Sequence, residues 1–479
     1  MTIALIVLCA VALFFGIIIV RAFLFRPPVA EPVFIEAASF DFKKTANHLA
    51  AMIRIPTVSS RDAAAVDLSR FEEFRALIDS LYPAVKKNCE KTLVGPSGIV
   101  YRWKGKSTKK PTVFMAHYDV VGANASEWDK PPFSGEIDDA GVLWGRGTID
   151  TKITVCGILE AVEKRIEQGF VPQRDVYLSF SGDEEVMGPS APAIVSWMEE
   201  QGIEPDLVLD EGGAVVKDIF PGVKKSCAVV GITEKGVLDI EFSVRAAGGH
   251  SSAPARHQPV VDLAAAIGRI AKKPFPLRLT PPAALMFDTL GRHSSFAFRI
   301  LFANLWCFLP LLKLVCRLSG GELAALMGTT CCFTILEGSS QYNIMPSVAR
   351  AGANLRLLPG DTAESAVRRL QRIAGEKRVS LKTEYSFDPS PVADLSGAAW
   401  QSVHDAVAAT WPDAIVSPYL MVACSDSRHF CRISKTVLRF SAMELTSEER
   451  GTMHAKNERI PVEKITTACE FFWRVIASA

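Results

Sequence analysis

Apolar and polar positions follow helical and strand periods in turn along most of the chain. Helical spacing predicts helices over residues 42–55, 64–82, 151–169 and 191–202, and apolar runs predict buried strands over 98–105, 111–121, 175–182 and 206–213. Strands that alternate with helices form a sheet with helices on its faces, and site residues gather where its strands end. We therefore expect an α/β domain whose functional residues follow these strands.

The N-terminus departs from this pattern, because residues 3–20, 18 in number, carry no charge. Such a stretch is long enough to cross a bilayer, and neither a basic leader nor a clean small-residue cleavage site accompanies it. We predict a single transmembrane anchor over residues 1–25 and a proline-rich linker over 26–44, with a cleaved signal peptide as the alternative. Arg21 and Arg26 favour a cytoplasmic position for the rest of the chain, but two charges leave the side of the membrane open.

Composition narrows the class of partner. The 479 residues are 49% hydrophobic and 22% charged, as in an ordinary globular protein with a large core. The net charge is +1 and no basic stripe or aromatic-basic motif is present, so we expect no nucleic-acid partner. The eleven cysteines are odd in number and irregularly spaced, and they predict no disulfide framework.

Three neighbouring carboxylates, Asp183 to Glu185, directly follow the strand predicted over 175–182. Neighbouring carboxylates repel each other, and in a desolvated place one of them takes up a proton unless a cation lies among them. The stretch is therefore either a solvated turn or half of a metal site.

Acids and histidines at other strand ends favour the metal site. His117 and Asp119 are two residues apart, so the carboxylate is placed to bond one imidazole nitrogen while the other faces a metal. Asp150 lies between a Gly-rich loop and a helix start, where a helix cap is the alternative. The other candidates of this kind are Glu184, Glu185, Asp210, Glu211 and, in a late loop, His454.

Six stretches together resemble one family of metallopeptidases. They are HYDVV (117–121), GRGTIDTK (145–152), SGDEEVMG (181–188), LDEGG (209–213), GGHSSAP (248–254) and MHAKNERI (453–460). They are similar to the dinuclear-zinc family of aminoacylase, carboxypeptidase S and succinyl-diaminopimelate desuccinylase, above all to its carboxypeptidase S and N-fatty-acyl-amino acid synthase/hydrolase branch. The resemblance extends from about residue 45 to the end of the chain.

The resemblance implies two Zn²⁺ ions per subunit. The implied ligands are His117 and Asp210 on one ion, Glu185 and His454 on the other, and Asp150 between them. Glu211 is the alternative to Asp210. Asp119 would orient His117, and Glu184 would be the general base.

The resemblance also implies a zinc-peptidase-like α/β catalytic domain, residues 45–234 and 392–479, interrupted by a smaller α+β lid or dimerisation domain over 235–391. In the lid, His250 is either an ordinary loop histidine or a residue that reaches the active site of another subunit in a homodimer. Arginine matches the planar geometry of a carboxylate. The candidates for binding a substrate carboxylate are Asn343, Arg356 and Arg428.

An apolar insertion over residues 277–327 is unusual for such a lid. On a continuous helix Arg299, Lys313 and Arg317 would share one face, although Pro310 would kink it. The insertion is interpreted as a packed lid helix, a membrane-interface element or the wall of an apolar substrate channel.

These observations predict a zinc-dependent amide-bond hydrolase that releases a free amino acid from an N-acyl-amino acid. In the more specific form of this prediction, the acyl chain is long and the reaction is reversible. The alternative is a carboxypeptidase or dipeptidase that acts on short peptides. A non-catalytic, membrane-anchored binding protein is a third interpretation, but such a protein would be expected to have lost Glu184 or a ligand.

Overall fold

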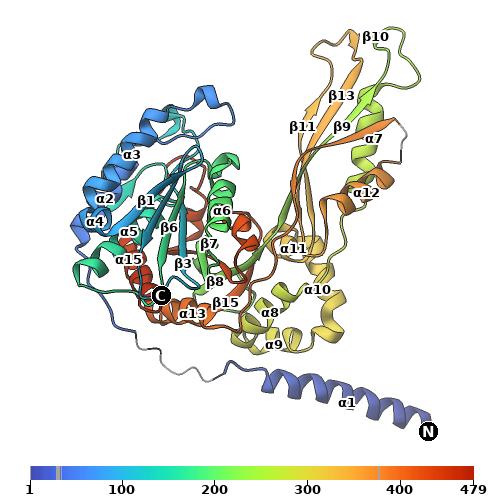
Figure 1. The fold of residues 1–479 in the computed structure, drawn as a ribbon. Helices are drawn as coiled ribbons and strands as arrows, with labels where there is room; N and C mark the ends of the chain where they lie inside the picture. Colours follow the sequence, from blue (N-terminus) through green and yellow to red (C-terminus); the bar gives the residue numbers. More distant parts are fainter. Residues whose placement is uncertain (1, 29–32, 34, 376–377) are drawn as a thin grey trace.

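A computed structural model describes residues 2–28, 33, 35–375 and 378–479, and in it two large sheets, beside two small ones of two and three strands, organise the chain (Figure 1). The larger sheet has eight strands in the order β1-β2-β6-β3-β7-β16-β8-β15. Their bounds are β1 Cys89–Val94, β2 Gly98–Trp103, β3 Thr112–His117, β6 Val176–Ser181, β7 Leu207–Val216, β8 Cys227–Glu234, β15 Ile415–Met421 and β16 Val437–Leu445. Strands β6, β3, β7 and β16 are parallel, so their carboxyl ends lie at one edge.

Helices cover both faces of this sheet, as the alternating pattern predicts. Phe114 of β3 packs on one face, with its ring 5.9 Å from that of Phe472, whereas its neighbour Met115 belongs to the core on the other face with Ile194. The covering helices are α2 Phe42–Ile53, α5 Lys152–Glu167, α13 Ala398–Thr410 and α15 Glu463–Ile476 on the first face, and α6 Ser190–Glu200 on the second. The predicted α/β architecture is confirmed.

The smaller sheet is antiparallel, has the order β11-β13-β9-β14, and carries α7 and α12. We call this sheet with its two helices the small unit; in Figure 1 it rises away from the larger sheet. Its bounds are β9 Gly236–Arg245, α7 Pro259–Ala271, β11 Thr330–Glu337, β13 Val348–Leu357, α12 Ala363–Ala374 and β14 Val379–Phe387. Leu238, Phe242 and Leu370 belong to a core that is distinct from that of the larger sheet. These elements fall within the stretch predicted as a lid, and their role as a lid stays a prediction.

The remaining elements are short or lie at the edges. They are η1 Ala63–Ala65, α3 Leu68–Leu81, α4 Pro83–Asn88, η2 Ala125–Glu127, β4 Glu136–Ile137, β5 Val142–Trp144, η3 Glu184–Val186, β10 Gly249–His250, β12 Ile344–Met345, η4 Asp426–Arg432, α14 Ser447–Arg450 and β17 Arg459–Pro461.

The apolar insertion forms four helices: α8 Pro281–His293, α9 Phe296–Phe302, α10 Leu305–Ser319 and α11 Gly321–Met327. The chain bends by 104° between α9 and α10, so Arg299 is not on the same helix as Lys313 and Arg317, and the single basic face expected for a continuous helix does not form. Pro310 lies inside α10, and the break comes before it. Buried residues of the insertion, such as Phe287, belong to the core of the larger sheet, because α8 packs against the edge strand β15.

The N-terminal stretch is a helix, α1, from Thr2 to Leu24. Its mean hydropathy is 3.3 over 18 residues, and it is long and apolar enough to cross a membrane. Of the linker predicted over 26–44, residues 29–32 and 34 lie outside the described residues.

Candidate metal centre

The candidate metal ligands meet at the carboxyl edge of the parallel strands. His117 ends β3, and it is in register with Ser181, the last residue of β6. The residues that follow β6 therefore lie beside His117, among them Glu184 and Glu185 in η3. Glu211 comes from β7, the strand on the other side of β3.

A first group of possible ligands consists of His117, Asp150 and Glu211. The imidazole Nε2 of His117 lies 3.0 Å from Asp150 Oδ1 and 3.3 Å from Glu211 Oε1. One ligand atom from each residue lies within 4.8 Å of the others. This is a spacing that one ion fills.

A second group consists of Asp150, Glu185 and His454. His454 Nε2 lies 2.9 Å from Asp150 Oδ2 and 3.1 Å from Glu185 Oε2. Asp150 therefore presents one carboxylate oxygen to each group. A carboxylate shared in this way is the arrangement expected between two metal ions.

The chemistry of these side chains fits bound cations. Burial raises the pKa of Glu211 to about 7, and the nearby carboxylates of Asp150 and Asp210 raise it too, while His117 lowers it. Oxygen Oε1 of Glu185 is buried and has no hydrogen-bond partner among the described residues. Imidazole and carboxylate donors suit a divalent transition metal, and a cation would relieve both the repulsion and the unpaired oxygen.

Asp119 connects the first group to the acidic turn. Its Oδ1 lies 3.3 Å from His117 Nδ1, and its two oxygens accept the backbone N–H groups of Glu184 and Glu185 at 3.2 and 3.1 Å. Asp119 is completely buried. It is therefore placed to orient the imidazole and to fix the turn that carries both glutamates.

Glu184 lies beside the two groups but belongs to neither. Burial raises the pKa of its carboxyl group well above the ordinary value; His117 opposes the shift, and Asp426 and Glu211 add to it. A carboxyl group that lies outside both donor groups and holds a proton readily is suited to act as a general base and acid.

Glu211, the alternative to Asp210, is the residue whose carboxylate lies within the first group, and the choice between the two as metal ligand stays a prediction. Asp210 Oδ2 accepts the backbone N–H of Ser427 at 3.0 Å, and Asp210 belongs to neither group of possible ligands. The pairing of β7 with β16 passes from Asp210 directly to Gly213, so Glu211 lies in a bulge. Bulges redirect side chains at the ends of strands.

His250 and Asn343 lie far from this centre in the chain's own fold. Strand β10 pairs with β12, so His250 faces Ile344, and Ser251 donates its N–H to the carbonyl of Asn343 at 3.1 Å. Figure 1 shows β10 at the end of the small unit that points away from the larger sheet. The structure brings these two residues together, but not with the metal ligands of the same chain.

Arg428 lies in η4, with its Nη1 3.9 Å from the carboxylate of Asp426. Its guanidinium stacks over the ring of Phe387 at 4.7 Å, and its Nη1 donates to the carbonyl of Ser425 at 2.6 Å. Its Nε is buried and has no hydrogen-bond partner among the described residues. Arg356, the other candidate, contacts Cys424 Sγ through Nη1 at 3.1 Å.

Glu458, whose carboxylate supports the loop that carries Asp150, was not singled out from the sequence. Its carboxylate accepts the N–H groups of Gly147, Ile149 and Asp150 and pairs with Arg146 Nη1 at 2.7 Å. Glu458 is completely buried. The signal was present, because Glu458 lies in the stretch MHAKNERI four residues after His454.

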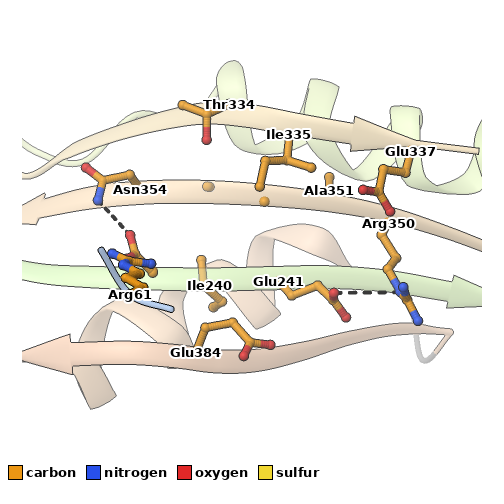
Figure 2. Close-up of a pocket in the computed structure, with 13 residues that line it drawn as sticks. Arg61, Ile240, Glu241, Thr334, Ile335, Glu337, Arg350, Ala351, Asn354 and Glu384 are labelled. Atoms are coloured by element: carbon orange, nitrogen blue, oxygen red, sulfur yellow. Dashed lines mark hydrogen bonds and ion pairs between the residues drawn. The ribbon is translucent and has the colours of Figure 1, made fainter. Parts of the chain in front are cut away.

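A hollow of about 430 Å³ lies elsewhere, on the sheet of the small unit (Figure 2). Its walls include Glu241, Arg350 and Glu384, and Arg61 reaches it from the larger part of the chain. None of the candidate ligands lines it. It is therefore not part of the metal centre.

Known proteins are similar to this chain in sequence and in fold. The protein named "Probable carboxypeptidase S-like 2" of Dictyostelium discoideum is 34% identical over 439 residues, 90% of this chain and 84% of the relative. The N-fatty-acyl-amino acid synthase/hydrolase PM20D1 of Xenopus tropicalis is 33% identical over 459 residues, 94% and 88% of the two chains. The M20 family metallo-carboxypeptidase Sso-CP2 of Sulfolobus solfataricus has the same fold, with a TM-score of 0.66 at 18% identity, over 90% of this chain and 98% of that one.

These similarities identify the family to which the chain belongs. The sequence pattern of peptidase family M20/M25/M40 matches residues 113–478, which include the five candidate ligands. The resemblance found in the six sequence stretches is confirmed. The chain is a metallohydrolase and belongs to peptidase family M20/M25/M40.

Proposed function

We propose that the chain is a zinc-dependent amide-bond hydrolase, with two Zn²⁺ per subunit, that releases a free amino acid from an N-acyl-amino acid. The observation that carries the proposal is the pair of donor groups that share Asp150. The proposed ligands are His117 and Glu211 on one ion, Glu185 and His454 on the other, and Asp150 between them. When bound, two such ions supply an activated water and polarise the amide carbonyl.

The chain's own residues supply the remaining steps. Glu184 takes a proton from the attacking water and returns it to the departing amine, which a buried carboxyl group with a raised pKa is suited to do. The Asp119 carboxylate accepts the backbone N–H of Glu184, which holds Glu184 in place, and it also orients His117. One buried carboxylate thus positions Glu184 together with two of the five proposed ligands, His117 and Glu185.

The relatives support the class of substrate. Among those with about 30% identity or more, one is named for synthesis and hydrolysis of N-fatty-acyl-amino acids and another for a carboxypeptidase-like activity. Both substrate classes end in a free carboxylate beside the scissile amide. We assign the binding of this carboxylate to Arg428, whose buried Nε is unpaired among the described residues. Arg356 and Asn343 are weaker candidates.

The main alternative is a carboxypeptidase or dipeptidase that removes C-terminal residues from short peptides. The names of the carboxypeptidase S relatives favour it. A non-catalytic binding protein is less consistent with the site, because Glu184 and a complete set of donor groups are present.

A panel of substrates tests the proposal. We expect the purified full chain to contain zinc and to release amino acid from N-acyl-amino acids. The value of kcat/KM should rise at least about tenfold from an acetyl to a dodecanoyl chain, because each methylene that becomes buried contributes ~0.8 kcal/mol. A profile that is flat with acyl length, together with faster cleavage of dipeptides, would support the peptide alternative instead.

We further propose that the chain forms a homodimer through the small unit and that His250 acts in the partner's active site. Within one chain, His250 lies at the far end of the small unit, away from the metal ligands of that chain. A role for His250 in catalysis would therefore require the active site of a second chain. Mixing His250→Ala chains with Glu184→Ala chains should then restore part of the activity that each lacks. An active monomer at high dilution would contradict this proposal.

We propose that α1 is retained as a single-pass membrane anchor. Its length and hydropathy support this role. A second support is that Ile18 and Ala22 are buried against the rest of the chain, which a cleaved signal peptide would not require.

A further inference from the structure

Helix α1 docks on the break between α9 and α10. The Arg21 guanidinium donates to the carbonyl of Ala303 at 2.9 Å and to Asn304 Oδ1 at 3.1 Å. In return, Asn304 Nδ2 donates to the carbonyl of Ile18 at 3.1 Å, and Asn304 is completely buried. The apolar helix and the apolar insertion are therefore held together by specific polar contacts.

Aromatic contacts extend this docking on both sides of the polar contact. The rings of Phe23 and Phe296 lie 4.6 Å apart, and those of Phe14 and Trp306 lie 5.9 Å apart. Figure 1 shows α1 running below α9 and away from both sheets. A membrane that surrounds α1 would thus lie close to the insertion.

The outer side of α10 is strongly apolar. Leu312 and Cys316 face inward and are buried, whereas a stripe of large side chains at helical spacing faces solvent. The exposed members are Leu311 (51%), Leu314 (53%), Val315 (48%) and Leu318 (79%). We call them the α10 stripe. Exposed apolar patches of this kind mark an interaction site.

The charges on α10 itself are of one sign. They are Lys313 and Arg317, whereas Arg292 on α8 is paired with Asp288 at 2.8 Å and Glu322 follows α10 in α11. Arg317 is exposed on α10 itself. An apolar stripe with basic neighbours suits a bilayer with anionic headgroups.

We propose that α10 lies in the membrane interface beside α1, with the α10 stripe in contact with lipid acyl chains. The helix does not span the bilayer: its 15 residues reach about 22 Å at 1.5 Å per residue, less than the ~30 Å hydrocarbon core, and the chain turns by 104° before it. With α1 as the first contact and α10 as the second, the rest of the chain is held in a fixed orientation to the membrane surface. This inference does not depend on the proposed catalytic reaction.

Photolabelling of the full chain tests the inference. The protein is reconstituted into vesicles of phosphatidylcholine and phosphatidylserine that contain a phosphatidylcholine with a diazirine in its acyl chain, and adducts are mapped by mass spectrometry. We expect adducts on Leu305–Ser319 as well as on α1. In the triple variant Leu311→Glu, Leu314→Glu, Leu318→Glu, adducts on α10 should fall at least about fivefold while those on α1 remain.

A matched control uses another exposed leucine. Leu336 on β11 is 67% exposed but belongs to the small unit, so Leu336→Glu should leave the adducts on α10 unchanged. Labelled α1 with unlabelled α10 in the wild-type chain would overturn the inference. So would chemical cross-links between the α10 helices of two chains without lipid adducts, since a second copy would then cover the stripe. If the triple variant does not fold, the adduct map of the wild-type chain still shows whether α10 contacts lipid.

Discussion

Replacing Glu184 with glutamine is expected to lower kcat by about 10²–10⁴-fold while the metal content stays at the wild-type value. Glu184 belongs to neither donor group, so the substitution removes no ligand. Glutamine keeps the shape of the side chain but neither accepts nor returns a proton. Steady-state kinetics and metal analysis on the same preparation measure the two effects.

The neighbouring residue is the matched control. Glu185→Ala should lose metal as well as activity, because Glu185 Oε2 lies 3.1 Å from His454 Nε2 within the second group. The same contrast separates Glu211→Ala, which should lose metal, from Asp210→Asn, which should keep it. Equal loss of metal in the Glu184 and Glu185 variants would contradict the division of roles between them.

The larger sheet and most of its site could be predicted because the signals are local. Buried parallel strands are near-continuous apolar runs, and the acids and histidines follow them directly. His117 and Glu185 are thus placed at the sheet edge by their own strands. Asp150 and His454 lie in loops, and there the family resemblance supplied what periodicity could not.

The choice between Asp210 and Glu211 shows where local reasoning ends. Both residues follow the same apolar run, and either one would give a carboxylate at the correct edge. The outcome depends on how β7 pairs with β16, a strand more than 200 residues away, whose register skips from Asp210 to Gly213. Only tertiary pairing places the bulge, which brings Glu211 Oε1 to 3.3 Å from His117 Nε2.

The insertion could not be predicted for a similar reason. The apolar run around Asn304 resembles one helix with a basic face. The structure breaks it at Asn304, whose side chain bonds both Ile300 and Ile18, the second from α1. The break thus coincides with a long-range contact to the N-terminal helix, and helical periodicity carries no signal of such a contact.

Removing the carboxylate of Glu458 is expected to be the most destabilising single change near the site. In Glu458→Ala, Arg146 becomes a buried, unpaired charge, and the N–H groups of Gly147, Ile149 and Asp150 lose their acceptor. Breaking a buried ion pair in this way costs about 3–5 kcal/mol of the free energy of unfolding. Urea denaturation of the metal-free chain measures the loss without the contribution of bound zinc.

An exposed ion pair provides the comparison for this prediction. Arg70 and Glu73 are 2.7 Å apart but about half exposed, so Glu73→Ala should lower the free energy of unfolding far less than Glu458→Ala does. The double variant Arg146→Met, Glu458→Gln should recover part of the stability lost in Glu458→Ala, because it removes the unpaired charge and keeps an acceptor for the loop. A loss at Glu458 no larger than that at Glu73 would mean that the loop before Asp150 holds its shape without this carboxylate, and the support assigned to Glu458 would be wrong.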